Sequence, residues 1–359
     1  MISAVTVVGS WLPRSLLGHC RALCAYIRMC YAALYVCLFT RSTLIFVDQI
    51  AACLPILRLF AVGRRVIFYC HFPDQLLTKR ESLAKRAYRW PLDRFEEWTT
   101  GLAHCVLVNS KFTERVFRST FRSLHHVPLL VLYPTFNSAA LDASGTTVGD
   151  CLEEQLGSET CNKCIFVSLN RYERKKNLAL ALKAFAELKS AQLLSPSKFN
   201  DMHLVIAGGY DRINAENVEH FVELTDLVTA HNLPPHSVTF LKSPSDIVKS
   251  TLIRRARALL YTPSFEHFGI VPLEAMYLST PVIAVASGGP LETVRNNDTG
   301  FLCQPDDHLS ASFAQCMAKL ALDQPLAESM GDAGRDWVMQ RFHFDAFAQQ
   351  LGNVCRAVM

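Results

Sequence analysis

The chain has 359 residues, of which half are hydrophobic and 19% are charged, and its net charge is +4. This length is sufficient for two domains of ordinary size, and the composition argues against a largely disordered chain. A charge balance this weak also argues against a nucleic-acid partner, which would require basic residues gathered in one stripe.

The first half of the chain alternates short β-branched or aromatic runs with helix-like segments. Predicted strands lie at 4–8, 43–47, 65–70, 105–109 and 129–133, and predicted helices lie at 79–100 and 111–121. Such alternation is typical of a parallel sheet with helices on both faces. We therefore assign residues 1–137 to a first Rossmann-like domain.

Two segments of this first domain are strongly apolar, at 23–39 and 44–62. Arg28 interrupts the first segment, and the uninterrupted part from 29 to 39 is too short to span a bilayer. The second contains Asp48, Gln49 and Arg58. We expect buried core helices or strands here, with peripheral membrane docking as an open alternative.

Small and polar residues dominate 138–163, which predicts a linker or surface insertion at a domain boundary. Alternation resumes with strands at 164–169, 202–208, 237–241, 258–262 and 281–286, separated by helices near 177–190, 214–231 and 246–256. Residues 164–359 are therefore expected to form a second doubly wound domain, with its last helix a candidate to return to the first. A ligand cleft between two such domains is the natural expectation.

The stretch EHFGIVPLEA at 266–275 follows one of these strands and leads into a predicted helix. The helix should begin near Gly269, so that backbone N–H groups from Gly269 to Val271 form a site for a diphosphate. A phosphate repels carboxylates, so Glu266 and Glu274 are expected to accept hydrogen bonds from sugar hydroxyls. The alternative is that both are ordinary surface or helix-terminal charges.

Basic and glycine-rich loops follow the other strands of the second half. Arg171 and Lys176 lie in the loop SLNRYERKKN, where cations would neutralise a diphosphate, whereas Lys175 is better explained as a solvated charge. Gly208 and Gly209 end another strand, and SGGP at 287–290 follows a third. Several glycines at one sheet edge indicate a ligand that approaches the backbone.

In the first half, His71 follows the apolar strand at 65–70 in the stretch FYCHFPD. A single histidine is more often structural. At the carboxyl edge of a parallel strand, however, it becomes a candidate site residue.

Several common motifs are absent from the sequence. It has no Asp-x-Asp, no Walker loop, no G-x-S-x-G and no GxGxxG after the first predicted strand. The lone CxxC at 161–164 has no second pair at zinc-site spacing. We therefore expect no metal, no cofactor and no nicotinamide chemistry, and thirteen scattered cysteines fit a reducing compartment.

These motifs together resemble a known family. YTPSFEHFGIVPLEAMYLSTPVIAVASGGPLE, with NRYERKKN upstream, is similar to glycosyltransferase family four, whose members are retaining enzymes of the GT-B fold. The match extends through 68–113, IAGGYDRINAENVEH and EHFGIVPLEAMY to the dolichol-pathway mannosyltransferases of this family. It covers nearly the whole chain and is weakest at 138–163 and at the C-terminus.

The resemblance implies roles for the predicted site residues. Glu274 would hold the ribose, Glu266 would contact the mannose, and Arg171 and Lys176 would grip the diphosphate and stabilise the leaving GDP. His71 would approach the donor sugar. The implied catalytic residues are Glu266, His71, Arg171 and Lys176. The implied donor-binding residues are Arg171, Lys176, Gly208, Gly209, Phe268, Gly269, Ile270, Val271 and Glu274.

The resemblance also implies a reaction. GDP-mannose would be the donor, and mannosylated chitobiose on dolichyl diphosphate would accept first an α-1,3 and then an α-1,6 mannose. The implied location is the cytosolic face of the endoplasmic reticulum membrane, with other dolichol-pathway transferases as candidate partners. Open alternatives are a family-four enzyme with another donor or acceptor, a catalytically inactive homologue that binds pathway enzymes, and a soluble nucleotide-binding protein.

The start of the chain departs from the family pattern. Family members begin with a strand, a glycine-rich loop and a helix, whereas the first strand predicted here begins at residue 4. An opening βαβ unit needs roughly thirty residues. We therefore expect upstream coding sequence to carry that unit, and the chain without it to be poorly soluble and nearly inactive.

Overall fold

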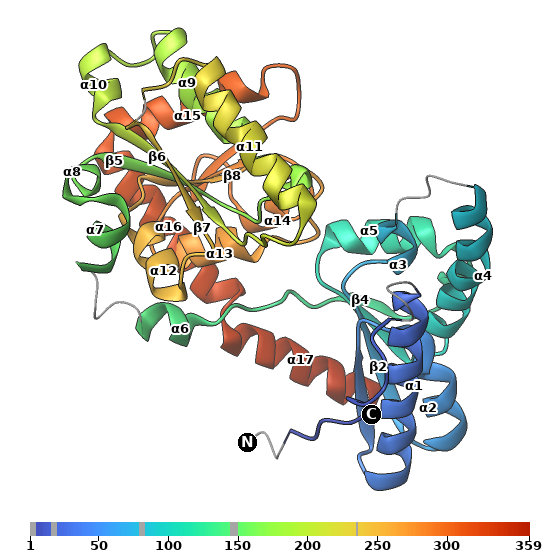
Figure 1. Cartoon of the computed structure of the whole chain (residues 1–359). Helices are drawn as coiled ribbons and strands as arrows, with labels where there is room; N and C mark the ends of the chain where they lie inside the picture. Colours follow the sequence, from blue (N-terminus) through green and yellow to red (C-terminus); the bar gives the residue numbers. More distant parts are fainter. Residues whose placement is uncertain (1–4, 16–19, 79–82, 144–149, 235) are drawn as a thin grey trace. The chain divides into compact units, whose positions relative to one another are not determined.

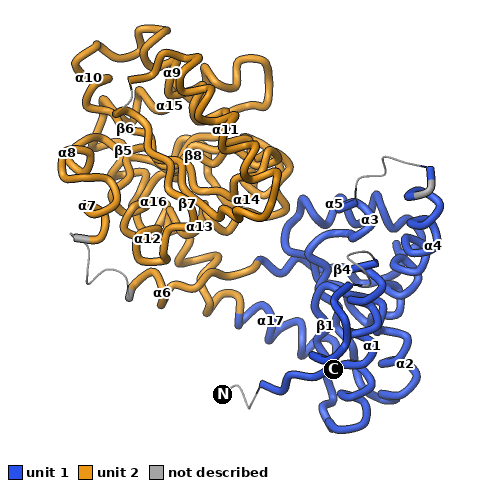
Figure 2. Tube along the Cα trace, in the orientation of Figure 1, with its two compact units in different colours: residues 1–133, 348–359 blue, residues 134–347 orange. Residues whose placement is uncertain are grey.

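The computed structural model describes residues 5–15, 20–78, 83–143, 150–234 and 236–359. The chain divides into two compact units, shown in Figure 2. Unit 1 contains residues 1–133 and 348–359, and unit 2 contains residues 134–347. Each unit is described by itself below.

Unit 1 is built on a parallel sheet in the order β1-β2-β3-β4 (Figure 1). Its strands are β1 (Leu44–Asp48), β2 (Arg65–Cys70), β3 (Cys105–Val108) and β4 (Leu129–Val131). Its helices are α1 (Arg21–Phe39), η1 (Ala51–Cys53), α2 (Leu54–Phe60), α3 (Asp74–Leu77), α4 (Leu83–Thr100), α5 (Lys111–Thr120) and η2 (Arg122–Leu124). These four strands confirm the predictions to within two residues at each end. Residues 79–82 of the helix predicted at 79–100 lie outside the described residues.

The core of unit 1 forms where the sheet meets its helices. Phe68 and Val106 from the strands pack with Leu54, Phe117 and Phe121, all of which are almost completely buried. Continuous apolar runs such as β2 are buried on both faces, as expected for a parallel strand.

Two predictions for unit 1 are wrong. Residues 5–8 of the strand predicted at 4–8 form no strand, and Val5 and Val7 are 85% and 77% exposed, so their alternation has no sheet to pack on. Residue 4 lies outside the described residues.

The apolar segment at 23–39 is one helix, α1, and not a buried core element, because only Cys24 and Ala33 of this helix are buried. By length and composition α1 is long enough to cross a membrane. The prediction of core burial holds for part of 44–62: residues 51–54 and Leu57 are buried, whereas Leu59, Phe60 and Val62 are exposed.

Unit 2 is built on a larger parallel sheet in the order β10-β9-β8-β5-β6-β7. Its strands are β5 (Cys164–Leu169), β6 (Met202–Gly208), β7 (Val238–Lys242), β8 (Ala258–Tyr261), β9 (Val282–Val285) and β10 (Gly300–Cys303). Its helices up to β8 are α6 (Ser138–Ala143), α7 (Asp150–Leu156), α8 (Ser158–Cys161), η4 (Arg174–Lys176), α9 (Leu178–Ser190), α10 (Pro196–Asn200), α11 (Ala215–Ala230) and α12 (Asp246–Arg255). The later helices are α13 (Ile270–Tyr277), α14 (Pro290–Thr293), α15 (Leu309–Leu322), α16 (Gln324–Arg341) and α17 (Phe344–Val358), which continues into unit 1.

The predicted linker at 138–163 differs from the structure. Its described residues contain α6, α7 and α8, and they belong to unit 2; residues 144–149 lie outside the described part. Contacts with distant residues hold α6 in place: Arg254 Nη2 donates to the carbonyl of Leu141 over 2.9 Å, and the Tyr277 hydroxyl donates to Asp142 over 2.9 Å. Strand β10 and helices α15 and α16 were not predicted, and the last helix was named in the sequence analysis without bounds.

Candidate active site

Four loops follow the carboxyl ends of parallel strands in unit 2. They come after β5, β6, β8 and β9, and they contain NRYERKKN, the glycine pair at 208–209, the stretch at 262–269 and SGGP. Because parallel strands place these ends at one edge of the sheet, the loops gather the predicted side chains of the second half in one region.

Lys176 and Glu266 form the closest charged pair of this edge. Lys176 Nζ lies 2.5 Å from Glu266 Oε2, and the two side chains are only 14% and 22% exposed. Thr262 Oγ1 donates to the carbonyl of Lys176 over 2.7 Å, which ties the loop after β5 to the loop after β8. Burial raises the pKa of Tyr261 well above its ordinary value, and the charge and hydrogen bond of Glu266 raise it further. The structure therefore brings together two residues that lie 90 positions apart in the sequence.

Two glycines of SGGP allow this loop to lie directly against the Glu266 segment. The backbone N–H of Gly289 donates to the carbonyl of Glu266 over 2.7 Å. A Cβ atom on Gly289 would lie 2.0 Å from the carbonyl oxygen of Phe268, and one on Gly288 would lie 2.3 Å from that of Glu266. Ser287 Oγ accepts from the backbone N–H of Phe265, whose φ is +54°. The SGGP loop thus fixes the position of the backbone at Glu266.

Replacing Gly289 by alanine should therefore destabilise unit 2 and displace Glu266. Because the clash is with backbone atoms, we expect a loss on the order of 3 kcal/mol of unfolding free energy, seen as a melting temperature lower by roughly 10 °C. Gly352→Ala is the matched control, since a Cβ there meets only the end of the Arg356 side chain at 3.7 Å. An equal melting temperature for Gly289→Ala and the parent would contradict the packing described.

Helix α13 begins directly after Gly269, as the sequence predicted. Gly269 adopts φ +86°, and no side chain caps the first turn. Its Cα approaches Tyr261 so closely that a Cβ would lie 3.0 Å from the tyrosine hydroxyl. Helix N-termini of this kind favour anions, because their first N–H groups have no partner within the helix. Ile270 is exposed at this end, whereas Phe268 is buried, with its ring 5.9 Å from that of Phe342.

Glu274 lies further along α13 and is paired with a lysine that sequence reasoning missed. Lys249 Nζ of α12 lies 2.9 Å from Glu274 Oε2, and the two side chains are 25% and 14% exposed. Nothing in the local sequence marks Lys249, since the contact depends on where the fold places α12 relative to Glu274.

Arg171 lies in the same loop as Lys176 but is much more exposed. Its side chain is 61% exposed, and its Nη1 atom lies 2.8 Å from Oε1 of Glu173, which also pairs with Lys175. Gly208, with φ +148°, lies against the backbone of Asn170, where a Cβ would come within 1.9 Å of the carbonyl oxygen. A Cβ on Gly209 would lie 3.3 Å from Arg171 Cγ. These glycines bring the loops after β5 and β6 into contact beside the Arg171 side chain.

His71 belongs to unit 1, where it follows β2. Its Nε2 atom lies 2.8 Å from Oδ1 of Asp48, the last residue of the neighbouring strand β1. The loop after His71 is fixed by Glu96, which accepts from the backbone N–H groups of Asp74 and Gln75 over 2.7 and 3.0 Å. Burial is the main cause that raises the pKa of Glu96 to about 7. Sequence reasoning missed both Asp48 and Glu96.

Comparisons with known proteins agree with this architecture. Residues 155–337 match the family described as glycosyl transferases group 1. Over 351 residues the chain is 46% identical to "Alpha-1,3/1,6-mannosyltransferase ALG2" of Homo sapiens, covering 97% of this chain and 82% of that protein. The Dictyostelium discoideum protein of the same name is 43% identical over 361 residues, covering 98% and 84%.

A solved structure shows the same fold. Sucrose-phosphate synthase from Thermosynechococcus elongatus superposes with a TM-score of 0.71 at 21% identity, covering 96% of this chain and 82% of that one. Two parallel sheets flanked by helices, together with this likeness, confirm the GT-B fold that the sequence predicted.

Proposed function

Because the chain belongs to the alpha-1,3/1,6-mannosyltransferase family and is thereby a mannosyltransferase of lipid-linked oligosaccharide synthesis, we propose GDP-mannose as its donor. The proposed acceptor is mannosylated chitobiose on dolichyl diphosphate, which receives an α-1,3 and then an α-1,6 mannose with retention. The observation that carries the proposal is the Lys176–Glu266 pair, in which Lys176 comes from the loop after β5 and Glu266 from the loop that leads to the helix N-terminus at Gly269.

The proposed donor site follows from the charges at this edge. The diphosphate binds to the N–H groups at the start of α13, while Lys176 and Arg171 neutralise it. Transfer breaks the bond between C1 of mannose and the diphosphate oxygen, so negative charge grows on the departing GDP. Cations already placed near the diphosphate stabilise that charge without further rearrangement.

The two glutamates have separate proposed roles. Glu266 accepts hydrogen bonds from mannose hydroxyls near the reacting carbon, and Glu274 accepts from the ribose hydroxyls. Each carboxylate is partly buried and held by a lysine, Lys176 for Glu266 and Lys249 for Glu274. In unit 1 we propose His71 as a site residue, and its hydrogen bond to Asp48 would fix the orientation of the imidazole ring.

The decisive assay incubates membranes that contain the protein with GDP-mannose and the lipid-linked acceptor, followed by sizing of the product. Two successive mannose additions support the proposal. Transfer from another nucleotide sugar in a donor competition would favour a different family-four activity. Binding of GDP-mannose without any transfer would favour the inactive homologue.

Transfer should not require a divalent metal. The sequence contains no Asp-x-Asp, so the diphosphate charge is expected to be neutralised by Arg171, Lys176 and the N–H groups of α13. We expect transfer to persist in EDTA at close to the untreated rate. Complete loss that magnesium restores, with intact membranes confirmed alongside, would contradict this arrangement.

We further propose that the protein acts at the cytosolic face of the endoplasmic reticulum membrane. The relatives indicate a role in this glycosylation pathway, and α1 offers a long apolar surface of which little is buried. Membrane fractionation tests the location, and recovery in the soluble fraction alone would favour the soluble alternative.

A further inference from the structure

A pocket in unit 1 has no part in the proposed reaction. It has a volume of about 380 Å³, which is within the range of small-ligand sites. Its lining residues are Leu57, Arg58, Ala61, Val62, Gly63, Arg64, Arg65 and His104. Arg65 begins β2 and His104 immediately precedes β3, so the pocket lies at the amino ends of these strands. This is the opposite edge of the sheet from His71.

The pocket holds two hydrogen-bond donors that point at each other. The backbone N–H of Val66 donates to Nδ1 of His104 over 2.9 Å, so in the neutral ring the proton must lie on Nε2. Arg58 Nη1 lies directly against that same Nε2 atom. A guanidinium has only donors, so neither group can accept from the other. An anionic oxygen that lies beside both groups, with the Arg58 side chain moved away from the ring, would accept from each of them.

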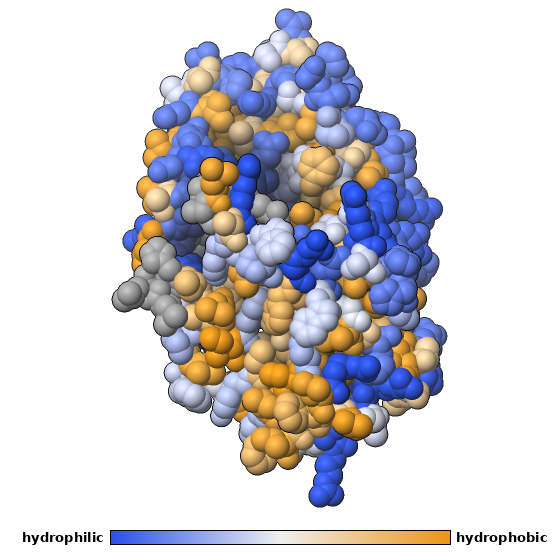
Figure 3. Space-filling model, turned by 90° about the vertical axis from the view of Figure 1, so that its right-hand side faces the viewer, coloured by the Kyte–Doolittle hydropathy of each residue, from blue (hydrophilic) through white to orange (hydrophobic). Residues whose placement is uncertain are grey.

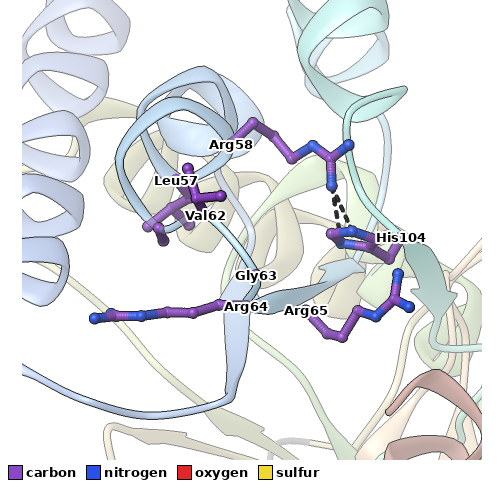
Figure 4. Close-up of a pocket in the computed structure, with 8 residues that line it drawn as sticks. Leu57, Arg58, Val62, Gly63, Arg64, Arg65 and His104 are labelled. Carbon is purple, nitrogen blue, oxygen red and sulfur yellow. Dashed lines mark hydrogen bonds between the residues drawn. The ribbon is translucent and has the colours of Figure 1, made fainter.

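The charges around this contact are also unbalanced. Within the described part of the chain, Arg58 and Arg65 form no ion pair with a carboxylate. In Figure 4 both side chains extend toward the side of His104, whereas Arg64 extends the other way. Arg64 donates to the carbonyls of Val36 and Thr40 at the end of α1. Burial and the charges of Arg58 and Arg65 lower the pKa of His104, which indicates a positive potential in the pocket.

Val62 lines the pocket and is exposed, and further exposed apolar side chains are close to the lining residues in the chain or to the partner of Arg64. Leu59, Phe60 and Val62 are 70%, 64% and 83% exposed, and they are neighbours of Arg58 and Gly63 in the chain. Leu38 and Phe39, at the end of α1 that Arg64 caps, are 74% and 70% exposed. Figure 3 shows apolar side chains gathered toward the bottom of the view. A cationic pocket with an apolar rim is complementary to a lipid whose phosphate is charged and whose chains are apolar.

We propose that Arg58, Arg65 and the Nε2–H of His104 form a binding site for the headgroup phosphate of an anionic membrane phospholipid. The phosphate oxygens accept from the two guanidinium groups and the imidazole, while the apolar rim enters the interface between headgroups and acyl chains. This site is separate from the donor site in unit 2, and it does not depend on the transfer reaction.

The test is flotation of the purified full-length chain with vesicles, without donor or acceptor. Vesicles of phosphatidylcholine alone are compared with phosphatidylcholine doped with phosphatidic acid. Each guanidinium near an anionic surface strengthens binding about fivefold, so Arg58→Gln with Arg65→Gln should weaken binding to the doped vesicles about 20- to 30-fold. Binding to pure phosphatidylcholine should stay unchanged, because the apolar rim remains.

Matched variants separate charge from folding. Arg58→Lys with Arg65→Lys should retain most of the preference for doped vesicles, and Arg115→Gln, on the exposed part of α5, should behave as the parent. Melting temperatures confirm that all variants fold. Unchanged binding of the double Gln variant, or equal loss on both vesicle types, overturns the proposal. If inorganic phosphate binds the protein as tightly as the doped vesicles do, the proposal that the ligand is a phospholipid is overturned.

Discussion

Replacement of Lys176 by alanine should lower the rate of mannosyl transfer by about 10²- to 10³-fold. Its side chain is only 14% exposed, so solvent screens its charge less than that of a surface lysine, and the charge acts more strongly on a bound diphosphate. Removal leaves Glu266 without its counter-ion as well. Steady-state transfer to the lipid-linked acceptor at saturating GDP-mannose measures the effect.

Lys175→Ala is the control for this result. The neighbouring lysine is 67% exposed and pairs with Glu173, so its loss should change the rate less than about twofold. Equal rates for Lys176→Ala and Lys175→Ala would reject the assignment of Lys176 to the diphosphate, even if both variants were slow.

Glu266→Gln should mainly reduce kcat, by about 10²-fold or more, with little change in KM. The amide keeps the size of the side chain but removes the negative charge. This charge strengthens the hydrogen bonds that the carboxylate accepts from mannose hydroxyls, and it balances the charge of Lys176. Interactions that strengthen as the transition state forms appear in kcat rather than in substrate binding. Initial rates over a range of GDP-mannose concentrations separate the two constants.

Glu274→Ala is the comparison, because a ribose contact is the same in the ground state and the transition state. We expect KM for GDP-mannose to rise about tenfold with kcat nearly unchanged. Lys249→Met, which removes the partner of Glu274 without touching the ligand, should change KM less. If both glutamate variants altered only KM, the division of roles between them would be wrong.

The strands were predictable because most are short runs that are apolar on both faces. Val66 to Cys70 is such a run, and a continuous apolar run of this length is typical of a strand that is buried on both faces of a parallel sheet. Residues 5–8 have a strand-like pattern too, but a strand also needs a hydrogen-bonded neighbour, which a local pattern does not reveal. The apolar composition of α1 predicted burial, yet composition does not distinguish a core helix from one on an apolar surface.

The part of the candidate site that was predictable consists of residues in loops that directly follow strands. Lys176 and Glu266 were each placed at the carboxyl edge, and the structure brings them into contact. The hydrogen-bonding and charged partners of the other site residues, His71 and Glu274, were not predictable in this way. Asp48 reaches His71 from the adjacent strand, and Lys249 reaches Glu274 from an adjacent helix, so both contacts depend on three-dimensional packing rather than on spacing in the chain.

The contact between Lys176 and Glu266 has a consequence for which molecules can occupy the empty enzyme. The Glu266 carboxylate repels an anion that approaches the Lys176 ammonium group, and orthophosphate or free ATP offers this carboxylate no hydroxyl in return. A nucleotide sugar brings an anion for the lysine and hydroxyls for the glutamate at the same time. With the roles proposed for Lys176 and Glu266, the pair would select nucleotide sugars over other phosphates, and we expect Glu266→Gln to be inhibited by orthophosphate more strongly than the parent enzyme.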